Sequence, residues 1–109
     1  LVMGFTFKEN CPDTRNTKVS DLVKELQPFA REVFVYDPHA SPEEAMHEYG
    51  ITISNTLPSG TFEGIVLAVR HNEVVEIAQK GLRPWLSSDA AFVYDIKEVL
   101  PVGESDGRL

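Results

Sequence analysis

Short apolar runs alternate with amphipathic helical patterns along this chain, and this alternation restricts the fold more than any other feature. Apolar runs of strand length predict buried strands, and apolar residues spaced three or four apart predict helices with one buried face. Strands joined by helices form parallel sheets with right-handed crossovers. We therefore predict a three-layer α/β fold, an open parallel sheet of about five strands with helices on both faces.

The predicted elements follow from these patterns and from their stop signals. Ser41 and Pro42, followed by Glu44, are typical of a helix start, and Gly50 and Gly81 suit helix ends. If the strands take the order 3-2-1-4-5, a ligand binds beyond their carboxyl ends, between the first and fourth strands. The predicted strands are residues 1–7, 33–36, 51–53, 65–69 and 91–94, and the predicted helices run from 17 to near 28, 41–50 and 72–80.

Composition and charge exclude several classes of protein. The 17 acidic and 10 basic residues give a formal charge of −7, which argues against a general nucleic-acid or anionic-membrane partner. No apolar run approaches the roughly 18 residues of a membrane span. The single cysteine, Cys11, cannot form an internal disulfide, which favours a cytoplasmic protein.

Because Leu1 already lies in a strand-like run and no initiator Met precedes it, we expect a segment of a longer protein.

Basic residues follow three of the predicted strands. Lys8 follows the first, Arg70 and His71 follow the fourth, and Lys97 follows the fifth. The carboxyl ends of parallel strands share one edge of the sheet, so an anionic ligand held there would gain charge-assisted hydrogen bonds. The alternative is that these residues are ordinary solvated loop charges.

The loop after the first strand lacks the glycines of a dinucleotide-binding turn, so this chain is not itself the NAD domain. Asp37 therefore fits a strand-ending Asp-Pro turn better than a ribose-binding acid.

Cys11 has no histidine near it in sequence to act as a base, which disfavours a catalytic role. No metal site is predicted, because metal-ligand spacing is absent from the three histidines, His39, His47 and His71.

The segment from Gly4 to Thr17 resembles the signature that opens the C-terminal domain of the UDP-glucose/GDP-mannose dehydrogenase family. In that signature, Phe-Lys is followed by a loop that reaches Asp-x-Arg and then Ser or Thr. Residues 35–38, 65–71 and 92–97 agree with the family in the same order. The resemblance implies that residues 1–102 form a Rossmann-like UDP-sugar-binding domain and that 103–109 form a flexible tail.

The family likeness also implies roles for individual residues. Phe7, Lys8 and Lys97 are expected to contact the substrate, and Arg15 is expected to reach the NAD pyrophosphate. Lys97 stands where the UDP-glucose enzymes have an Arg after Asp-Gly, whereas this chain reads Asp-Ile-Lys. Together with residues 9–12, 16–17 and 69–71, that departure makes the chain more similar to the branch that oxidises UDP-N-acetylhexosamines, such as UDP-GlcNAc or UDP-GalNAc, for bacterial surface polysaccharides. No catalytic residue is expected in this chain, and Cys11 does not match the family nucleophile.

The implied enzyme oxidises the C6 alcohol of a UDP-hexose to a carboxylate in two hydride transfers to NAD, through a catalytic Cys that this chain lacks. Its expected partners are a UDP-sugar, the rest of the parent chain and a second copy bound through an absent central domain. Two alternatives remain. The first is a phosphoacceptor receiver, which would need an acidic pair where Lys8 stands. The second is a non-catalytic module that binds nucleotide or serves as a scaffold.

Overall fold

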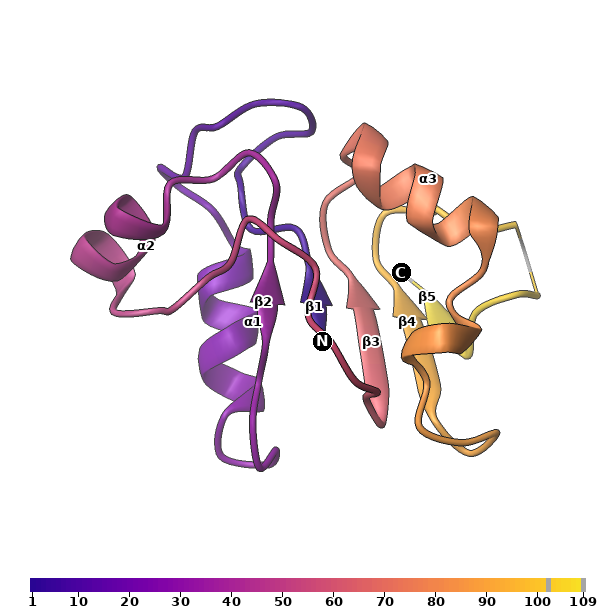
Figure 1. Ribbon diagram of the computed structural model, residues 1–109. Helices are drawn as coiled ribbons and strands as arrows, with labels where there is room; N and C mark the ends of the chain where they lie inside the picture. The colour runs from indigo at the N-terminus through magenta and orange to yellow at the C-terminus, as the bar shows by residue number, and fades with distance from the viewer. Residues whose placement is uncertain (102, 109) are drawn as a thin grey trace.

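The computed structural model describes residues 1–101 and 103–108 and contains a single parallel sheet with helices around it (Figure 1). Three α-helices and a short 3-10 helix, η1, connect the strands. In chain order the elements are β1 (Val2–Met3), α1 (Val19–Leu26), β2 (Val35–Tyr36), α2 (Pro42–Tyr49), β3 (Gly64–Leu67), α3 (Asn72–Lys80), η1 (Arg83–Trp85), β4 (Phe92–Asp95) and β5 (Gly107–Arg108).

The strands take the order β2-β1-β3-β4-β5, and every neighbouring pair is parallel. The chain first winds outward from β1 to β2 and then returns to add β3 on the other side. The order therefore reverses between β1 and β3. These are the first and fourth of the predicted strands, between which the sequence places the reversal. The predicted strand 51–53 is not a strand: it is replaced by one parallel bridge between Tyr36 and Ser54, at the free edge of β2.

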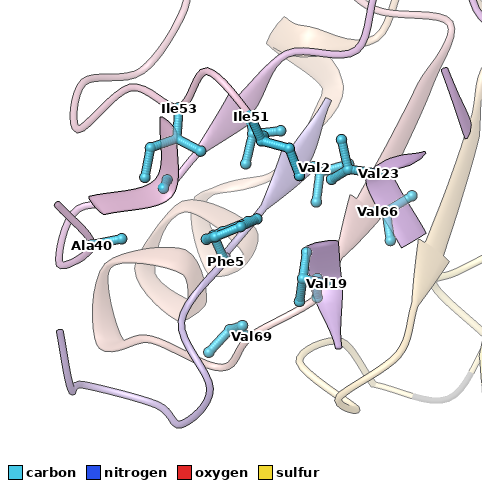
Figure 2. Packing of buried hydrophobic residues seen from close by; sticks show 12 residues of the cluster. Val2, Phe5, Val19, Val23, Ala40, Ile51, Ile53, Val66 and Val69 are labelled. Carbon is cyan, nitrogen blue, oxygen red and sulfur yellow. The ribbon is translucent and has the colours of Figure 1, made fainter. Parts of the chain in front are cut away.

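Alternate residues of the strands enter two separate cores, which makes the three layers. Val2, Val35 and Val66 face one side, where they pack with residues of α1 and α2. Met3 and Leu67 face the other side, where they pack with residues of α3. Figure 2 shows the first core, in which Phe5 lies among side chains from several segments. The predicted α/β fold with helices on both faces is confirmed.

Strand β1 ends sooner than predicted because Gly4 leaves the extended conformation. Gly4 has a φ of 104°, and a Cβ at this position would lie 2.5 Å from Cβ of Val69. The chain turns there, and Phe5 becomes fully buried in the first core. The predicted helix ends agree better: Ser41 Oγ accepts a hydrogen bond from Glu44 N–H at 3.2 Å, and Gly50 ends α2 with a φ of 68°.

The sheet is less completely covered on the α1–α2 side, over its last strands. Phe92 and Tyr94 of β4 are 49% and 37% exposed there. Their rings lie against Gly64 and Gly107, where a Cβ would meet them at 2.4 and 2.6 Å. The segment predicted as a flexible tail contributes β5, which pairs with β4. Within the described part of the chain, no helix has the length and apolarity required to cross a bilayer.

Candidate functional site

Three of the predicted site residues lie in loops at the carboxyl edge of the sheet. Phe7 and Lys8 follow β1, and Lys97 follows β4. All three are exposed, and Phe7 is exposed by 60% although it is a large apolar side chain. Only β3 separates β1 from β4, so the two loops start roughly 10 Å apart, twice the spacing between neighbouring strands. Both ammonium groups, of Lys8 and Lys97, are accessible to an anionic ligand at this edge.

A buried carboxylate, Asp37, ties the first of these loops to the sheet. It stands directly after β2 and is completely buried. Its Oδ2 accepts hydrogen bonds from Phe5 N–H at 2.6 Å, Thr6 N–H at 3.1 Å and His71 Nε2 at 2.8 Å. Its Oδ1 accepts from the N–H groups of His39 and Ala40 at 2.7 and 3.0 Å. Asp37 therefore joins the segments that follow β1, β2 and β3.

These hydrogen bonds keep Asp37 ionised. Burial by itself raises the pKa of Asp37, but the hydrogen bonds from His71, Phe5 N–H and His39 N–H outweigh burial and lower that pKa from 3.8 to about 2. The sequence predicts an Asp-Pro turn after the strand. The turn is present, but the turn alone accounts for only the two bonds from residues 39 and 40.

His71 is the second member of this buried network, and it is completely inaccessible to solvent. Its Nε2 lies 2.8 Å from Asp37 Oδ2, and its Nδ1 accepts a hydrogen bond from Asn10 N–H at 2.8 Å. The sequence places His71 beside Arg70 at the exit of a strand and leaves its role open. In the structure both ring nitrogens of His71 are turned toward protein groups, so the ring does not face a ligand.

The loop that carries Lys8 is attached to the start of α3. Asn10 Oδ1 accepts a hydrogen bond from Asn72 N–H at 2.8 Å, and Asn10 Nδ2 donates to Asn72 Oδ1 at 3.2 Å. Asn10 thus caps the start of α3 from a distant part of the sequence. Asn10 itself has a φ of 57°. The crevice predicted between β1 and β3 is therefore bridged by contacts among loop residues.

A second buried carboxylate organises the loop that carries Lys97. Asp95 is completely buried, and its two oxygens accept hydrogen bonds from Val99 N–H and Leu100 N–H at 2.9 and 2.7 Å. The turn formed in this way places Lys97 on its outer side, exposed to solvent. Each substrate-binding candidate therefore stands in a loop anchored by a buried aspartate at a strand end.

Arg15 lies in the same long loop as Lys8 but is held by a different partner. Its guanidinium forms two hydrogen bonds with Asp13, from Nε to Oδ1 and from a terminal nitrogen to Oδ2, both at 3.0 Å. The side-chain hydrogen bond to Asp13 raises the pKa of Arg15, and the same bond lowers the pKa of Asp13. The Arg15 side chain is 78% exposed, so it is accessible to a ligand from solvent.

Sequence reasoning missed the anchoring residues rather than the exposed ones. His71 contacts Thr6 and Asn10, which precede it by 65 and 61 residues. No local sequence pattern indicates such a pairing. The one available signal was the position of His71 at the exit of the most apolar strand, opposite the loop of Lys8.

Known proteins are similar to this chain along its whole length. The family model described as "UDP-glucose/GDP-mannose dehydrogenase family, UDP binding domain" matches residues 1–102. Two proteins named UDP-N-acetyl-D-glucosamine 6-dehydrogenase, from Pseudomonas aeruginosa and Salmonella typhi, are 49% and 41% identical over all 109 residues. Protein CapL of Staphylococcus aureus is 35% identical over 99 residues, which are 91% of this chain and 23% of that protein. The chain spans about a quarter of the length of these relatives, 26% and 25% for the first two.

A solved structure supports the fold independently. A ternary complex of GDP-mannose dehydrogenase from Pseudomonas aeruginosa matches 98% of this chain with a TM-score of 0.67, at 15% identity and over 26% of its own length. Together, the sheet topology and this structural match define an open α/β domain, and its candidate site residues lie in loops at the carboxyl edge. The chain belongs to the UDP-binding domain of the UDP-glucose/GDP-mannose dehydrogenase family.

Proposed function

We propose that this chain is the nucleotide-sugar-binding domain of an NAD-dependent 6-dehydrogenase that oxidises a UDP-N-acetylhexosamine, UDP-GlcNAc or UDP-GalNAc, for surface polysaccharide synthesis. The observation that carries the proposal is the 49% and 41% identity, over all 109 residues, to two UDP-N-acetyl-D-glucosamine 6-dehydrogenases. The domain comprises residues 1–102 in this proposal, the range that the family model matches.

In this proposal, Phe7, Lys8 and Lys97 bind the nucleotide sugar. The diphosphate of a UDP-sugar is anionic, and the ammonium groups of Lys8 and Lys97 supply positive charge on a protein whose net charge is −7. The exposed ring of Phe7 offers an apolar surface for the base or the sugar. Lys97 acts as a point charge where a guanidinium would form a two-pronged contact, so its contact with the substrate is less directional.

Two molecules of NAD⁺ each accept one hydride in the proposed reaction. One alcohol, one water and two NAD⁺ yield one carboxylate, two NADH and three protons, so atoms and electrons balance. No glycine-rich turn follows β1, and residues 8–12 occupy that place, so the dinucleotide is bound mainly outside this chain. Arg15 fits a supporting role, because its exposed guanidinium presents donors of the kind that pyrophosphate oxygens accept. The nucleophile that holds the reacting carbon covalently between the two hydride transfers is a Cys outside this chain.

The test is NADH formation by the full-length protein with UDP-GlcNAc, UDP-GalNAc, UDP-glucose and GDP-mannose in parallel. We expect two NADH per sugar with one of the N-acetylhexosamines. Lys8→Ala and Lys97→Ala should each raise KM for that sugar by roughly ten-fold or more, the loss expected for a charge-assisted hydrogen bond. Lys24→Ala, which removes an exposed lysine near the end of α1, is the matched control and should leave KM unchanged.

Two results would contradict the proposal. Wild-type kinetics in both Lys8→Ala and Lys97→Ala would refute the assignment of the site. A folded full-length protein that binds NAD and turns over none of the four sugars would favour the alternative, a non-catalytic module that binds nucleotide or serves as a scaffold. The proposal also places the enzyme in the cytoplasm, as a homodimer joined through a central domain.

A further inference from the structure

The neutral ring of His71 adopts one tautomer because each ring nitrogen faces a different kind of group. Nδ1 accepts a hydrogen bond from Asn10 N–H at 2.8 Å, so Nδ1 carries a lone pair. The proton of the neutral ring therefore lies on Nε2, which faces Asp37 Oδ2 at 2.8 Å and Thr6 Oγ1 at 3.0 Å. Asp37 thus selects the tautomer of His71.

The same network holds the backbone on both sides of Lys8. The Thr6 hydroxyl donates to the carbonyl oxygen of Lys8 at 3.0 Å, which leaves its oxygen as an acceptor toward His71 Nε2–H. His71 Nδ1 holds the N–H of Asn10, two residues further along. The backbone around Lys8 is therefore attached to a fully buried ring, while the Lys8 side chain stays exposed.

We propose that His71 is a positioning residue for substrate binding: its Nδ1 fixes the Lys8–Asn10 backbone so that the Lys8 ammonium is presented to the anionic part of the nucleotide sugar. The inference rests on the proposed function, because it assigns a purpose to the geometry of Lys8. It adds a residue that does not touch substrate and acts through the loop. Asp37 serves the same purpose one step further back, by keeping the proton of His71 on Nε2.

Two substitutions separate the two halves of the His71 ring. The side-chain oxygen of Asn occupies nearly the position of Nδ1, so His71→Asn keeps the acceptor for Asn10 and loses the donor for Asp37. The side-chain nitrogen of Gln occupies nearly the position of Nε2, so His71→Gln keeps the donor for Asp37 and loses the acceptor for Asn10. A purely structural His71 would make both variants lose stability and substrate affinity together.

We expect His71→Gln to weaken substrate binding more than stability, and His71→Asn to weaken stability more than substrate binding. In the full-length protein at saturating NAD, His71→Gln should raise KM for the nucleotide sugar by roughly ten-fold, with kcat changed less than about two-fold. His71→Asn should lower the Tm more than His71→Gln and keep KM within about two-fold of wild type. Amide hydrogen exchange of Asn10, measured by NMR on the 109-residue chain, should accelerate in His71→Gln and not in His71→Asn.

A second pair of variants keeps the test decisive if His71→Asn does not fold. Thr6→Val removes the hydroxyl that holds the Lys8 carbonyl and should raise KM several-fold. Thr14→Val makes the same change at another buried threonine, whose hydroxyl has no hydrogen-bond partner among the described residues, and should not change KM.

The outcomes distinguish this inference from the proposed function. An unchanged KM in both His71→Gln and Thr6→Val, in an enzyme that turns over the sugar, would overturn the positioning role alone. A proton on Nδ1 of His71, seen in ¹⁵N spectra of the ring, would also overturn it. Lack of turnover with every nucleotide sugar would instead refute the proposed function.

Discussion

Replacement of Asp37 by Asn should remove one of the largest pH-dependent contributions to the stability of this domain. The pKa of Asp37 is about 2 in the folded chain and 3.8 as its ordinary value, and each unit corresponds to about 1.4 kcal/mol. The ionised carboxylate therefore adds about 2 kcal/mol to the free energy of unfolding at neutral pH. Because the folded pKa is the lower one, this contribution is complete above about pH 5 and is lost as the pH falls through 3.8 toward 2.

The total cost of the substitution is larger than the pH-dependent part. An Asn at this position offers one acceptor oxygen, whereas the carboxylate accepts three hydrogen bonds on Oδ2 and two on Oδ1. At least two backbone N–H groups lose their acceptor in either orientation of the amide. Each unsatisfied buried donor costs about 1–3 kcal/mol, so we expect Asp37→Asn to lower the free energy of unfolding by about 3–5 kcal/mol at pH 7.

Urea unfolding of the 109-residue chain between pH 3 and pH 7, followed by the fluorescence of its one tryptophan, Trp85, is the measurement. The stability difference between wild type and Asp37→Asn should shrink by about 1 kcal/mol at pH 3 relative to pH 7. Asp21→Asn changes an exposed carboxylate on α1 and is the control, with an expected change within about 0.5 kcal/mol. A difference that stays the same from pH 7 to pH 3, or is below about 1 kcal/mol at pH 7, would refute the reasoning.

Three further predictions concern other parts of the molecule. Arg15→Ala in the full-length protein should raise KM for NAD and leave KM for the nucleotide sugar unchanged; an effect on the sugar alone would show that the assignment is wrong. Gly4→Ala should destabilise the chain by roughly 2–4 kcal/mol, because the methyl group meets Val69, whereas Gly60→Ala, with a φ of 93° and open space around it, should cost only about 1–2 kcal/mol in urea unfolding. Ser41→Ala should cost about 1 kcal/mol through loss of the α2 cap, and Ser41→Asp should restore most of it; equal Tm values for all three chains would contradict that role.

The parts of the fold that depend on local patterns could be predicted from the sequence. Asn72–Lys80 was predicted with both ends correct, because Gly81 closes a run with clear helical spacing. The strand 51–53 was wrong, since a short apolar run indicates burial without showing whether its neighbour will pair for more than one residue. The strand β5 was missed because its residues, Gly107 and Arg108, carry no apolar signal.

The candidate site divides in the same way. The position of Lys8 and Lys97 at the carboxyl edge follows from the strand exits alone. The contacts that anchor the loop of Lys8 do not, since His71 and Asn10 meet across 61 residues of chain. Asp37 illustrates the limit well: the Asp-Pro turn is visible in the sequence, whereas three of its five hydrogen bonds come from residues 31 to 34 positions away.

The five hydrogen bonds of Asp37 also restrict how this domain can be recombined. One carboxylate joins residues 5–6, 39–40 and 71. These three segments are distant along the chain, but they must come from the same parent for their contacts to be preserved. A chimera of two relatives with a crossover between residues 10 and 37 would combine a loop from one parent with a buried acceptor from the other. Where the parents differ in backbone geometry at these segments, such a chimera should fold poorly, whereas exchange of all three segments together should be tolerated.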